Sequence, residues 1–404
     1  MNPRITRRFA TASVCVAGLA PTALGQNHLL VPSQFPEIGL AVQAAAPGDV
    51  IEVTERLPHY QPFVIDRPVT IVGSAGEHRA PTVRVLQGVG IDVQLAPGER
   101  ATLSRIDVIA DATAVATVGI QILGGAVALE DCRFRSGDDL TAQTAVVEVD
   151  GAQLTAVFCR FEGGRGGTAL RATNSYVAIT DTRCFGGTMP AGDGVVVLDC
   201  ELHATEAWLL GGEDFVAGPG GVALRVAGTS QVTLHQGWAS GGNGQPGGSG
   251  LVNTTANPVE FSGAGFGGGM NFTTLISAPA AIGPTTMNAD LVGLLWNEPP
   301  YRRGTLQPGQ PWAAWARTNP NVLGMLAFSF GPSGLAALVT RQPALLPQDI
   351  ALLHPFVTGA LGYGGFGATL PNDPTLRGTV LWAQAITGPQ FPLEASPPSA
   401  VVVR

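Results

Sequence analysis

One pattern recurs five times along this chain: LEDCRFRSG from Leu129, AVFCRFEGG from Ala156, ITDTRCFGG from Ile179, ATEAWLLGG from Ala204 and LHQGWASGG from Leu234. Each copy runs from an apolar residue through a turn to a second short apolar stretch and a glycine. The starts lie 27, 23, 25 and 30 residues apart, and LSRIDV from Leu103 adds an earlier copy. A period of about 20–30 residues is typical of stacked coils, because one coil cannot bury its own apolar face. We therefore expect an all-β chain that begins with a parallel β-solenoid.

The composition favours such a stack. Of the 404 residues, 45% are apolar, only 13% are charged and 54 are glycine. Glycine supplies the positive φ angles that tight corners require, whereas a disordered chain would carry more charge and fewer apolar residues. The length allows one long solenoid and a second domain.

The N-terminus has the layout of an export signal. Three arginines within the first eight residues precede the apolar run Phe9–Ala20, and small residues follow before Gln26. This order is typical of a cleavable signal peptide, which we assign to residues 1–25. The apolar run is too short to span a bilayer, and no later segment is long enough. We expect a secreted or cell-surface protein with no membrane span after signal removal.

All 22 basic residues are arginine. Removing the first 25 residues leaves 19 arginines against 30 acidic residues, a net charge of −11. A nucleic-acid partner needs a basic face, so we expect none. Strongly anionic polysaccharides would also be repelled, except where arginines cluster.

Four cysteines remain after the signal: Cys132, Cys159, Cys184 and Cys200. Their spacing matches no zinc motif. Cys132 and Cys159 hold the same position in consecutive copies, where stacked strands place Cα atoms about 4.8 Å apart. A disulfide is compatible with that distance and with an oxidising compartment, and a pair of stacked buried thiols is the alternative.

Alternation of apolar and polar residues predicts two ladders of stacked side chains. In the repeat, the first residues point inward, Asp131, Asp181 and Glu206 occupy turns, and the outward row is Asp107, Arg133, Arg160, Arg183, Trp208 and Trp238. In the second ladder, the inward pairs are Ile120/Ile122, Val147/Val149, Leu170/Ala172, Val196/Leu198, Leu224/Val226 and Val252/Thr254. Its outward residues are Gln121, Glu148, Arg171, Val197, Arg225 and Asn253, followed by Asp150, Thr173, Asp199, Ala227 and Thr255.

The segment Pro36–Gly73 (PEIGLAVQAAAPGDVIEVTERLPHYQPFVIDRPVTIVG) resembles the N-terminal cap of right-handed parallel β-helix proteins of the pectate-lyase-like superfamily. It contains an amphipathic helix at Ile38–Ala46, strands at Val50–Val53 and Val69–Val72, and Tyr60. The resemblance implies a right-handed parallel β-helix, which we place at residues 26–283. It does not decide the chemistry, because that superfamily contains lyases, hydrolases, epimerases and non-enzymatic binders.

After Ile282 the repeat stops and strand-like runs return, among them Met325–Phe330 and Thr379–Ile386. The stretch Gly367–Ile386 resembles the last strands of a C-terminal sandwich module found on many bacterial secreted and surface proteins. It implies a small antiparallel β-sandwich, which we place at residues 284–404, and an accessory role.

The outward row Arg133, Arg160, Arg183, Trp208 and Trp238 is the first candidate site. Guanidinium and indole planes at about 4.8 Å steps form a platform on which sugar rings can stack. The alternative is structural: the arginines pair with Asp107 or turn carboxylates, and the tryptophans lie beneath a loop or the sandwich.

The second ladder offers a cleft with Glu148, Asp150, Arg171 and Asp199 as candidate catalytic residues and Arg225 as a further ligand-binding residue. A glycosidase needs two carboxylates at a set separation, and Asp150 and Asp199 would lie two coils apart, about 10 Å. The alternative is a salt-bridged, solvated face. A compact acid–base cluster is missing.

The histidines His59, His78, His203, His235 and His354 show no metal-ligand spacing, and we expect surface or turn positions for them. The sequence therefore favours an exported β-helix protein that binds or organises an extracellular polysaccharide or cell-envelope component, without catalysis, cofactor or metal. The alternative is a polysaccharide lyase or glycoside hydrolase acting in the cleft.

Overall fold

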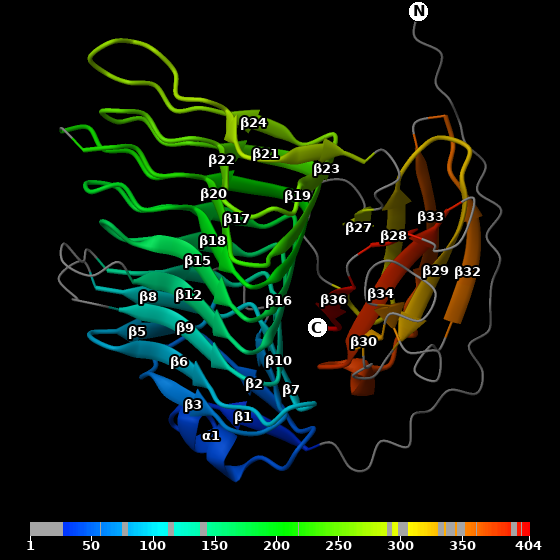
Figure 1. Ribbon diagram of the computed structural model, residues 1–404. Helices are drawn as coiled ribbons and strands as arrows, with labels where there is room; N and C mark the ends of the chain where they lie inside the picture. Colours follow the sequence, from blue (N-terminus) through cyan, green and yellow to red (C-terminus); the bar gives the residue numbers. More distant parts are fainter. Residues whose placement is uncertain are drawn as a thin grey trace, which may run out of the picture.

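A computed structural model of the chain describes residues 27–404, except 57, 75–79, 112–116, 138–143, 217, 289–292, 298–305, 330–334, 337–343, 346–351, 361, 389–393 and 397. These residues form a parallel β-helix and, beside it, antiparallel sheets (Figure 1). The expected all-β fold is confirmed. The predicted export signal, residues 1–25, lies outside the described residues.

The first coil is capped as the sequence indicates. Strand β1 (His28–Val31) pairs with β2 (Val50–Val53), and helix α1 (Ile38–Ala44) buries Ile38, Ala41 and Val42 against the core. Tyr60 is fully buried and its hydroxyl donates to the carbonyl of Thr54 at 2.6 Å. The cap covers the apolar interior that an open solenoid end would expose.

Three rows of parallel strands run along the β-helix. The row that we call the loop face contains β3 (Phe63–Ile65), β6 (Val89–Val93), β9 (Val118–Leu123), β12 (Ala145–Asp150), β15 (Thr168–Thr173), β18 (Val195–Leu198), β20 (Leu224–Ala227), β22 (Leu251–Asn253) and β25 (Ala281–Ile282). The docking face contains β1, β2, β4 (Thr70–Gly73), β7 (Arg100–Ser104), β10 (Ala126–Glu130), β13 (Gln153–Val157), β16 (Tyr176–Thr180), the first halves of β19 (Glu201–Leu210) and β21 (Gln231–Ser240), β23 (Val259–Ser262) and β26 (Thr285–Met287). The platform face contains β5 (Thr82–Val85), β8 (Asp107–Ala110), β11 (Arg133–Arg135), β14 (Arg160–Glu162), β17 (Arg183–Phe185), the second halves of β19 and β21, and β24 (Gly265–Gly267).

A turn row separates the docking face from the platform face. One residue of each coil has a left-handed φ there: Arg105, Asp131, Phe158, Asp181, Glu206 and Gln236, with φ between 42° and 58°. The predicted turn positions of Asp131, Asp181 and Glu206 are therefore confirmed. The left-handed conformation bends the chain sharply between two strands of the same coil.

The last glycine of each repeat has a packing role. Gly137, Gly164, Gly187, Gly212 and Gly242 stack, with Gly269 beyond them. A side chain on Gly187 would collide with the carbonyl oxygen of Gly164, and each later member meets its predecessor in the same way. Only glycine lets the backbones of successive coils approach so closely, which explains why the repeat ends on this residue.

The first ladder has the predicted register, because Arg133 pairs with Arg160, Arg160 with Arg183, Arg183 with Trp208 and Trp208 with Trp238. The second ladder is wrong in two coils. Val195 and Val197, instead of Val196 and Leu198, are buried opposite Leu170 and Ala172. The run of three valines shows no alternation of apolar and polar residues, so the sequence could not show which of them point inward.

The other displaced coil is β22, where Leu251 and Asn253 point inward instead of Val252 and Thr254. The buried amide of Asn253 donates to the carbonyls of Asn257 at 2.8 Å and Pro284 at 2.9 Å. These hydrogen bonds replace those lost to water, which is how a polar residue is accommodated in an apolar row.

The four described cysteines are free and buried. Burial and the neighbouring Cys132 thiol raise the pKa of Cys159 well above its ordinary value. The structure thus has the stacked thiols, one of the two arrangements that the sequence allows.

Residues beyond the last parallel strand form an antiparallel sandwich. One sheet holds β27 (Gly293–Asn297), β28 (Pro311–Arg317) and β33 (Tyr363–Thr369). The other holds β32 (Leu352–Val357), β29 (Leu323–Ser329), β34 (Val380–Thr387), β35 (Glu394–Ala395) and β36 (Ser399–Val402). A strand pair, β30 (Leu335–Ala336) and β31 (Ala344–Leu345), and a 3-10 helix, η2 (Pro374–Leu376), complete the described elements. Leu294, Ala314, Phe328 and Leu381 from both sheets share one core.

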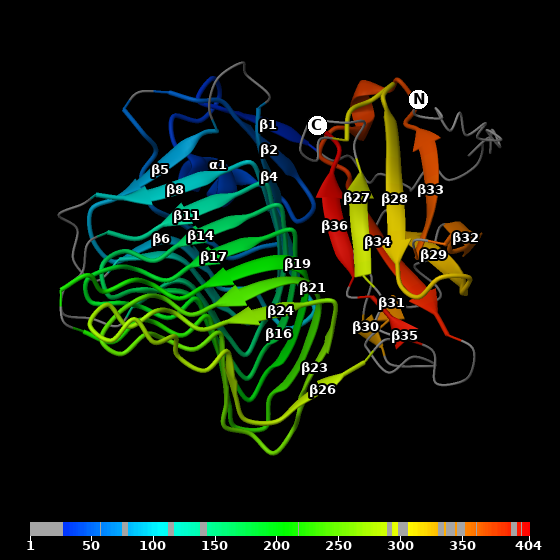
Figure 2. The same ribbon diagram turned by 90° about the horizontal axis from the view of Figure 1, so that it is seen from above.

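The sandwich packs against the docking face (Figure 2). Val402 packs against Val50 and Val72, and Trp382 packs against Ala128. No helix in the described part of the chain has the length and apolar character needed to cross a membrane.

Candidate functional site

The platform face carries one continuous outward row of side chains. Strand pairing aligns Thr82, Asp107, Arg133, Arg160, Arg183, Trp208, Trp238 and Gly265 on successive coils. Adjacent members are separated by the spacing of neighbouring strands, about 4.8 Å. Within the row, three arginines are followed by two tryptophans, in the order that the sequence predicts.

The two tryptophans are open to solvent. Trp208 is 49% exposed and Trp238 is 43% exposed, so the alternative that a loop or the sandwich covers them is wrong. The Trp238 ring extends over β24, where a side chain at Gly265 would collide with it. Glycine on the following coil therefore leaves room for the indole.

A second outward row flanks the first. It contains Arg84, Ile109, Arg135, Glu162, Phe185, Leu210, Ser240 and Gly267. Phe185 and Leu210 are half-buried, and they extend the apolar surface beside the indoles. The Arg183 guanidinium lies 6.0 Å from the Trp208 ring centroid, and that of Arg160 lies 5.0 Å from the Phe185 centroid. Such cation–π contacts fix the arginine planes near the aromatic rings.

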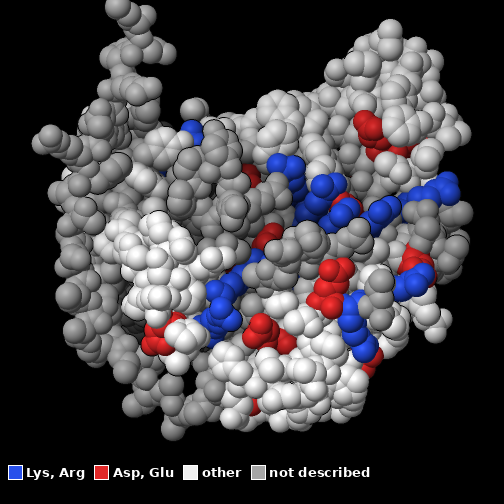
Figure 3. Space-filling view, turned by 180° about the vertical axis from the view of Figure 1, so that it is seen from behind, with Lys and Arg blue, Asp and Glu red and all other residues white. Residues whose placement is uncertain are grey.

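The basic part of the row is largely neutralised. Glu162 forms ion pairs with Arg133, at 2.9 Å, and with Arg160. The alternative of paired arginines is therefore right for these two, although the partner is neither Asp107 nor a turn carboxylate. The rear view in Figure 3 accordingly shows acidic and basic atoms side by side. Within the described residues, Arg183 has no carboxylate partner.

Asp107 is the other carboxylate of this face. Its pKa is raised to about 6 by burial, against the lowering effect of the nearby Arg133 guanidinium. Asp107 is half-buried beside Arg133, whose guanidinium is paired with Glu162.

The predicted cleft on the loop face does not assemble as expected. Asp150 lies on the same rung as Thr173, which pairs with Leu198, so Asp199 falls in the following turn. Asp199 accepts hydrogen bonds there from the backbone N–H of Thr229 at 2.8 Å and from its hydroxyl at 3.0 Å. The expected alignment of Asp150 with Asp199 is wrong, because the register of β18 is shifted by one residue.

The remaining charges of the loop face form pairs. Arg171 lies 3.4 Å from Glu148, and Arg225 lies 2.7 Å from Asp193. The sequence reasoning missed Asp193; its position just before β18 was the available signal. Both arginines line an open pocket of about 780 Å³ between the glycine-rich loops. This arrangement agrees with the salt-bridged face that was the alternative to a catalytic cleft.

Two histidines are not in the surface or turn positions expected of them. His203 and His235 lie on β19 and β21 and are buried. The His203 ring bonds to Glu201 at 2.8 Å and packs against Tyr176, with ring centroids 5.5 Å apart. Burial and the Arg317 charge lower the pKa of His235 to about 4. Among the described residues, no group of three His, Cys, Asp or Glu side chains could hold a metal ion.

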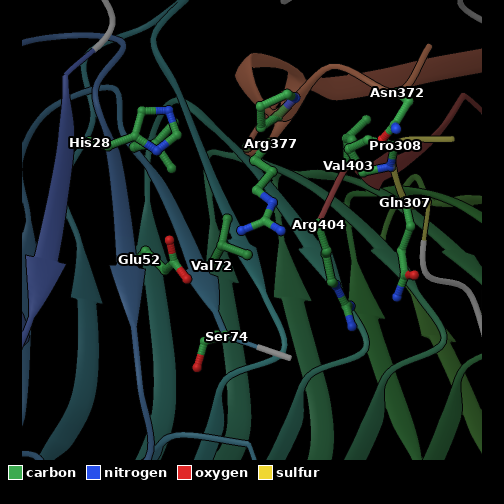
Figure 4. A pocket seen from close by; sticks show the side chains of 14 residues that line it. His28, Glu52, Val72, Ser74, Gln307, Pro308, Asn372, Arg377, Val403 and Arg404 are labelled. Atoms are coloured by element: carbon green, nitrogen blue, oxygen red, sulfur yellow. The ribbon is translucent and has the colours of Figure 1, made fainter. Parts of the chain in front are cut away.

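A further pocket of about 470 Å³ lies between the first coils and the sandwich (Figure 4). Side chains of Glu52 and Arg377 point toward it, and His28 stands at its edge. His28 and Arg377 are exposed, so water satisfies their polar groups. The pocket is an open notch, and the platform face is the better developed candidate site.

Comparison with known proteins gives distant structural matches. No protein-family model matches the sequence, and no curated protein matches it. Among solved structures, pectate lyase Pel9A is 13% identical, with 63% of this chain and 73% of that chain aligned and a TM-score of 0.42. Full-length tailspike protein 2 from an Escherichia coli O157:H7 bacteriophage is 10% identical, covering 94% of this chain and 68% of that one, with a TM-score of 0.34. The enzymatically active domain of tailspike protein 2 from bacteriophage CBA120 is 11% identical, covering 90% and 73%, at the same TM-score of 0.34. At these values no residue role is transferred to this chain.

Proposed function

We propose that this protein is an exported β-helix protein that binds an extracellular polysaccharide or a cell-envelope glycan along its platform face. The observation that carries the proposal is the exposed pair Trp208 and Trp238, aligned on adjacent coils. Exposed indoles on a rigid sheet offer apolar, polarisable faces to sugar rings at little cost in conformational entropy. The flanking Phe185 and Leu210 widen that surface.

The charge pattern favours a neutral glycan. Glu162 neutralises Arg133 and Arg160, so on the described platform face only Arg135 and Arg183 have no carboxylate partner. The chain as a whole has a net charge of −8. A densely anionic polysaccharide would be repelled at long range and would find few unpaired cations to offset that repulsion.

Binding without catalysis fits the carboxylates of the platform face. Glycoside hydrolysis requires a pair of carboxyl groups that flank the scissile bond. On the described platform face, Glu162 is held by two arginines and Asp107 is half-buried. Asp107 lies four coils and Glu162 two coils before Trp208, so neither lies beside a sugar ring stacked on the indoles.

A second candidate function is catalysis in the loop-face pocket, favoured by the grouping of Arg171, Asp193 and Arg225 around it. Asp193 would be the acid or base and the arginines would hold a carboxylate of the substrate. Release of unsaturated or reducing products from a polysaccharide panel, abolished by Asp193→Asn, would establish this function in place of simple binding.

The test of the platform is affinity electrophoresis in gels that contain neutral polysaccharides such as xylan, glucomannan or β-glucan. We expect retention by the wild type and a 5- to 10-fold weaker affinity for Trp208→Ala or Trp238→Ala, from about 1 kcal/mol per stacked ring. Leu353→Ala, an exposed apolar residue of the sandwich, is the matched control. Equal retention of all variants would refute the proposal that the platform face binds the glycan.

A further inference from the structure

The two ends of the β-helix differ. Helix α1 covers the first coil, whereas the last coil, built from β23 to β26, lies at the opposite end (Figure 1). In the described chain, β25 pairs only with β22 and β26 only with β23. Each therefore presents a free strand edge, a row of backbone donors and acceptors with no partner strand.

The apolar interior reaches the surface at this end. Met287 continues the inward row of Leu234 and Phe261, yet it is 71% exposed, whereas Leu234 is 3% exposed. Phe261 and Phe266, which pack edge to face below it, are only partly buried. In a solenoid, a terminal coil normally has a polar outer face that keeps the core from water.

Apolar side chains also surround the end. Phe272, Leu275, Ile276 and Ile282 are all exposed, and Leu275 reaches 72%. Together with Met287, Phe261 and Phe266, these side chains of the last coil make up what we call the end face. Monomeric proteins rarely expose a large group of apolar side chains to water.

The end face has no charge. Residues 261–289 contain no Asp, Glu, Lys, Arg or His, although 13% of the whole chain is charged. Free strand edges are normally protected by charged side chains or by proline, because an unprotected edge pairs with other chains. The two prolines of this stretch, Pro279 and Pro284, precede β25 and β26 and lie outside both strands.

We propose that the end face binds the end face of a second copy of this chain, to form a two-fold symmetric dimer in which the two β-helices meet end to end. Two uncharged surfaces of the same kind meet without repulsion, and the free edge of β26 is satisfied by the same edge of its partner. Because α1 closes the other end, this contact joins two copies and does not extend into a fibre. The inference goes beyond glycan binding, and it stands whether or not the platform binds a sugar.

The dimer would also place two platform faces on one rigid body. Two linked binding surfaces that engage the same polysaccharide bind more tightly than one, because the second contact is intramolecular. Binding of a long glycan would then depend on protein concentration in the range where the dimer dissociates.

Sedimentation velocity of the full mature chain between about 0.5 and 50 µM tests the proposal, a range that spans dissociation constants of ordinary dimers. We expect twice the chain mass for the wild type, and the mass of one chain for Met287→Asp. Leu275→Glu, in a loop outside the strands, should give the same result if the strand variant fails to fold. Leu353→Asp, an exposed apolar position on the sandwich, should remain dimeric.

Four outcomes would overturn the proposal: a monomeric wild type at 50 µM, an open-ended series of larger species, a dimer that survives both end-face changes, or a dimer lost equally in Leu353→Asp. A monomer would indicate that a different protein or another segment of this chain covers the end face. Circular dichroism of each variant shows whether the β-helix is intact, so loss of folding is distinguished from loss of association.

Discussion

Glu206 of the β-helix and Arg317 of the sandwich form an ion pair of 3.1 Å across the boundary between the two parts. The same arrangement occurs three coils earlier, where Asp131 binds Arg404 at 3.3 Å. Phe158, between them in the turn row, packs against the sandwich core. Three of the left-handed residues that bend the coils, Asp131, Phe158 and Glu206, thus also contact the sandwich.

Glu130 should contribute to the pH dependence of stability. It is completely buried, accepts hydrogen bonds from Ser104 at 2.8 Å and Val402 N–H at 3.0 Å, and lies 3.5 Å from Arg404. Burial raises its pKa to about 7, against the lowering effect of Arg404. A carboxyl group with a raised pKa in the folded state stabilises the fold at low pH, and this contribution is lost as pH rises through about 7.

Above pH 6.5, where the contribution of His235 no longer changes, we expect the wild-type Tm to fall as the pH rises to 8, and the fall to be smaller in Glu130→Gln, which cannot ionise. Thermal unfolding by circular dichroism across this pH range is the measurement. Glu206→Gln, a half-exposed position in the neighbouring turn row, should keep the wild-type slope. An unchanged slope in Glu130→Gln would contradict the prediction.

The Trp238 ring depends on glycine in the next coil. In Gly265→Ala the new methyl group meets the indole and must displace it. We expect glycan retention to fall about as much as in Trp238→Ala, roughly 5- to 10-fold. Gly367→Ala in the sandwich, where the nearest atom would be 3.4 Å from the added carbon, should bind like wild type. Full retention by Gly265→Ala would indicate that the ring position is unimportant.

Arg183 should contribute to binding through Trp208. Its guanidinium lies 6.0 Å from the ring centroid and holds the indole in place. Arg183→Ala should weaken binding of a neutral glycan two- to fivefold, corresponding to about 0.5–1 kcal/mol for an exposed cation–π contact. Arg84→Ala, four coils away and paired with Asp111, should have no effect in the same electrophoresis. A large loss of glycan affinity in Arg84→Ala would place the binding site elsewhere on the platform face.

A substitution at Asn253 tests whether Leu251 and Asn253 of β22 point inward on the loop face. Its amide satisfies two backbone carbonyls and accepts from the Thr255 N–H at 3.0 Å. Asn253→Val should therefore lower the free energy of unfolding by about 2–4 kcal/mol, although valine suits an apolar row. Urea denaturation measures this loss, and Val252→Thr, at a half-exposed neighbouring position, is expected to change little. A stabilised Asn253→Val would show that the amide bonds contribute nothing.

Sequence reasoning succeeded where the repeat is strict. The Arg/Trp position and the final glycine recur at fixed places in each copy, so the register of the platform face followed from alignment alone. It failed at Val195–Leu198 and Leu251–Asn253, because loops of unequal length precede these strands and apolar alternation is lost in them.

The ion-pair partners were harder to predict from the sequence. Glu162 stands two residues after Arg160, on the same outward side of β14, so strand alternation could have found it. Arg317 and Arg404 lie 111 and 273 residues from their partners Glu206 and Asp131. Only the packing of the sandwich brings these pairs together, and no local pattern encodes it.

The two turn-row anchors limit how the β-helix can change in length. Asp131 and Glu206 must remain three coils apart to meet Arg404 and Arg317 on the sandwich. Duplication of a coil between them would move one acid a full strand spacing away from its arginine, whereas an added coil beyond Glu206 would leave both contacts intact. The sandwich therefore fixes the number of coils between Asp131 and Glu206. The number of coils beyond Glu206, toward the C-terminal end of the solenoid, is free to vary.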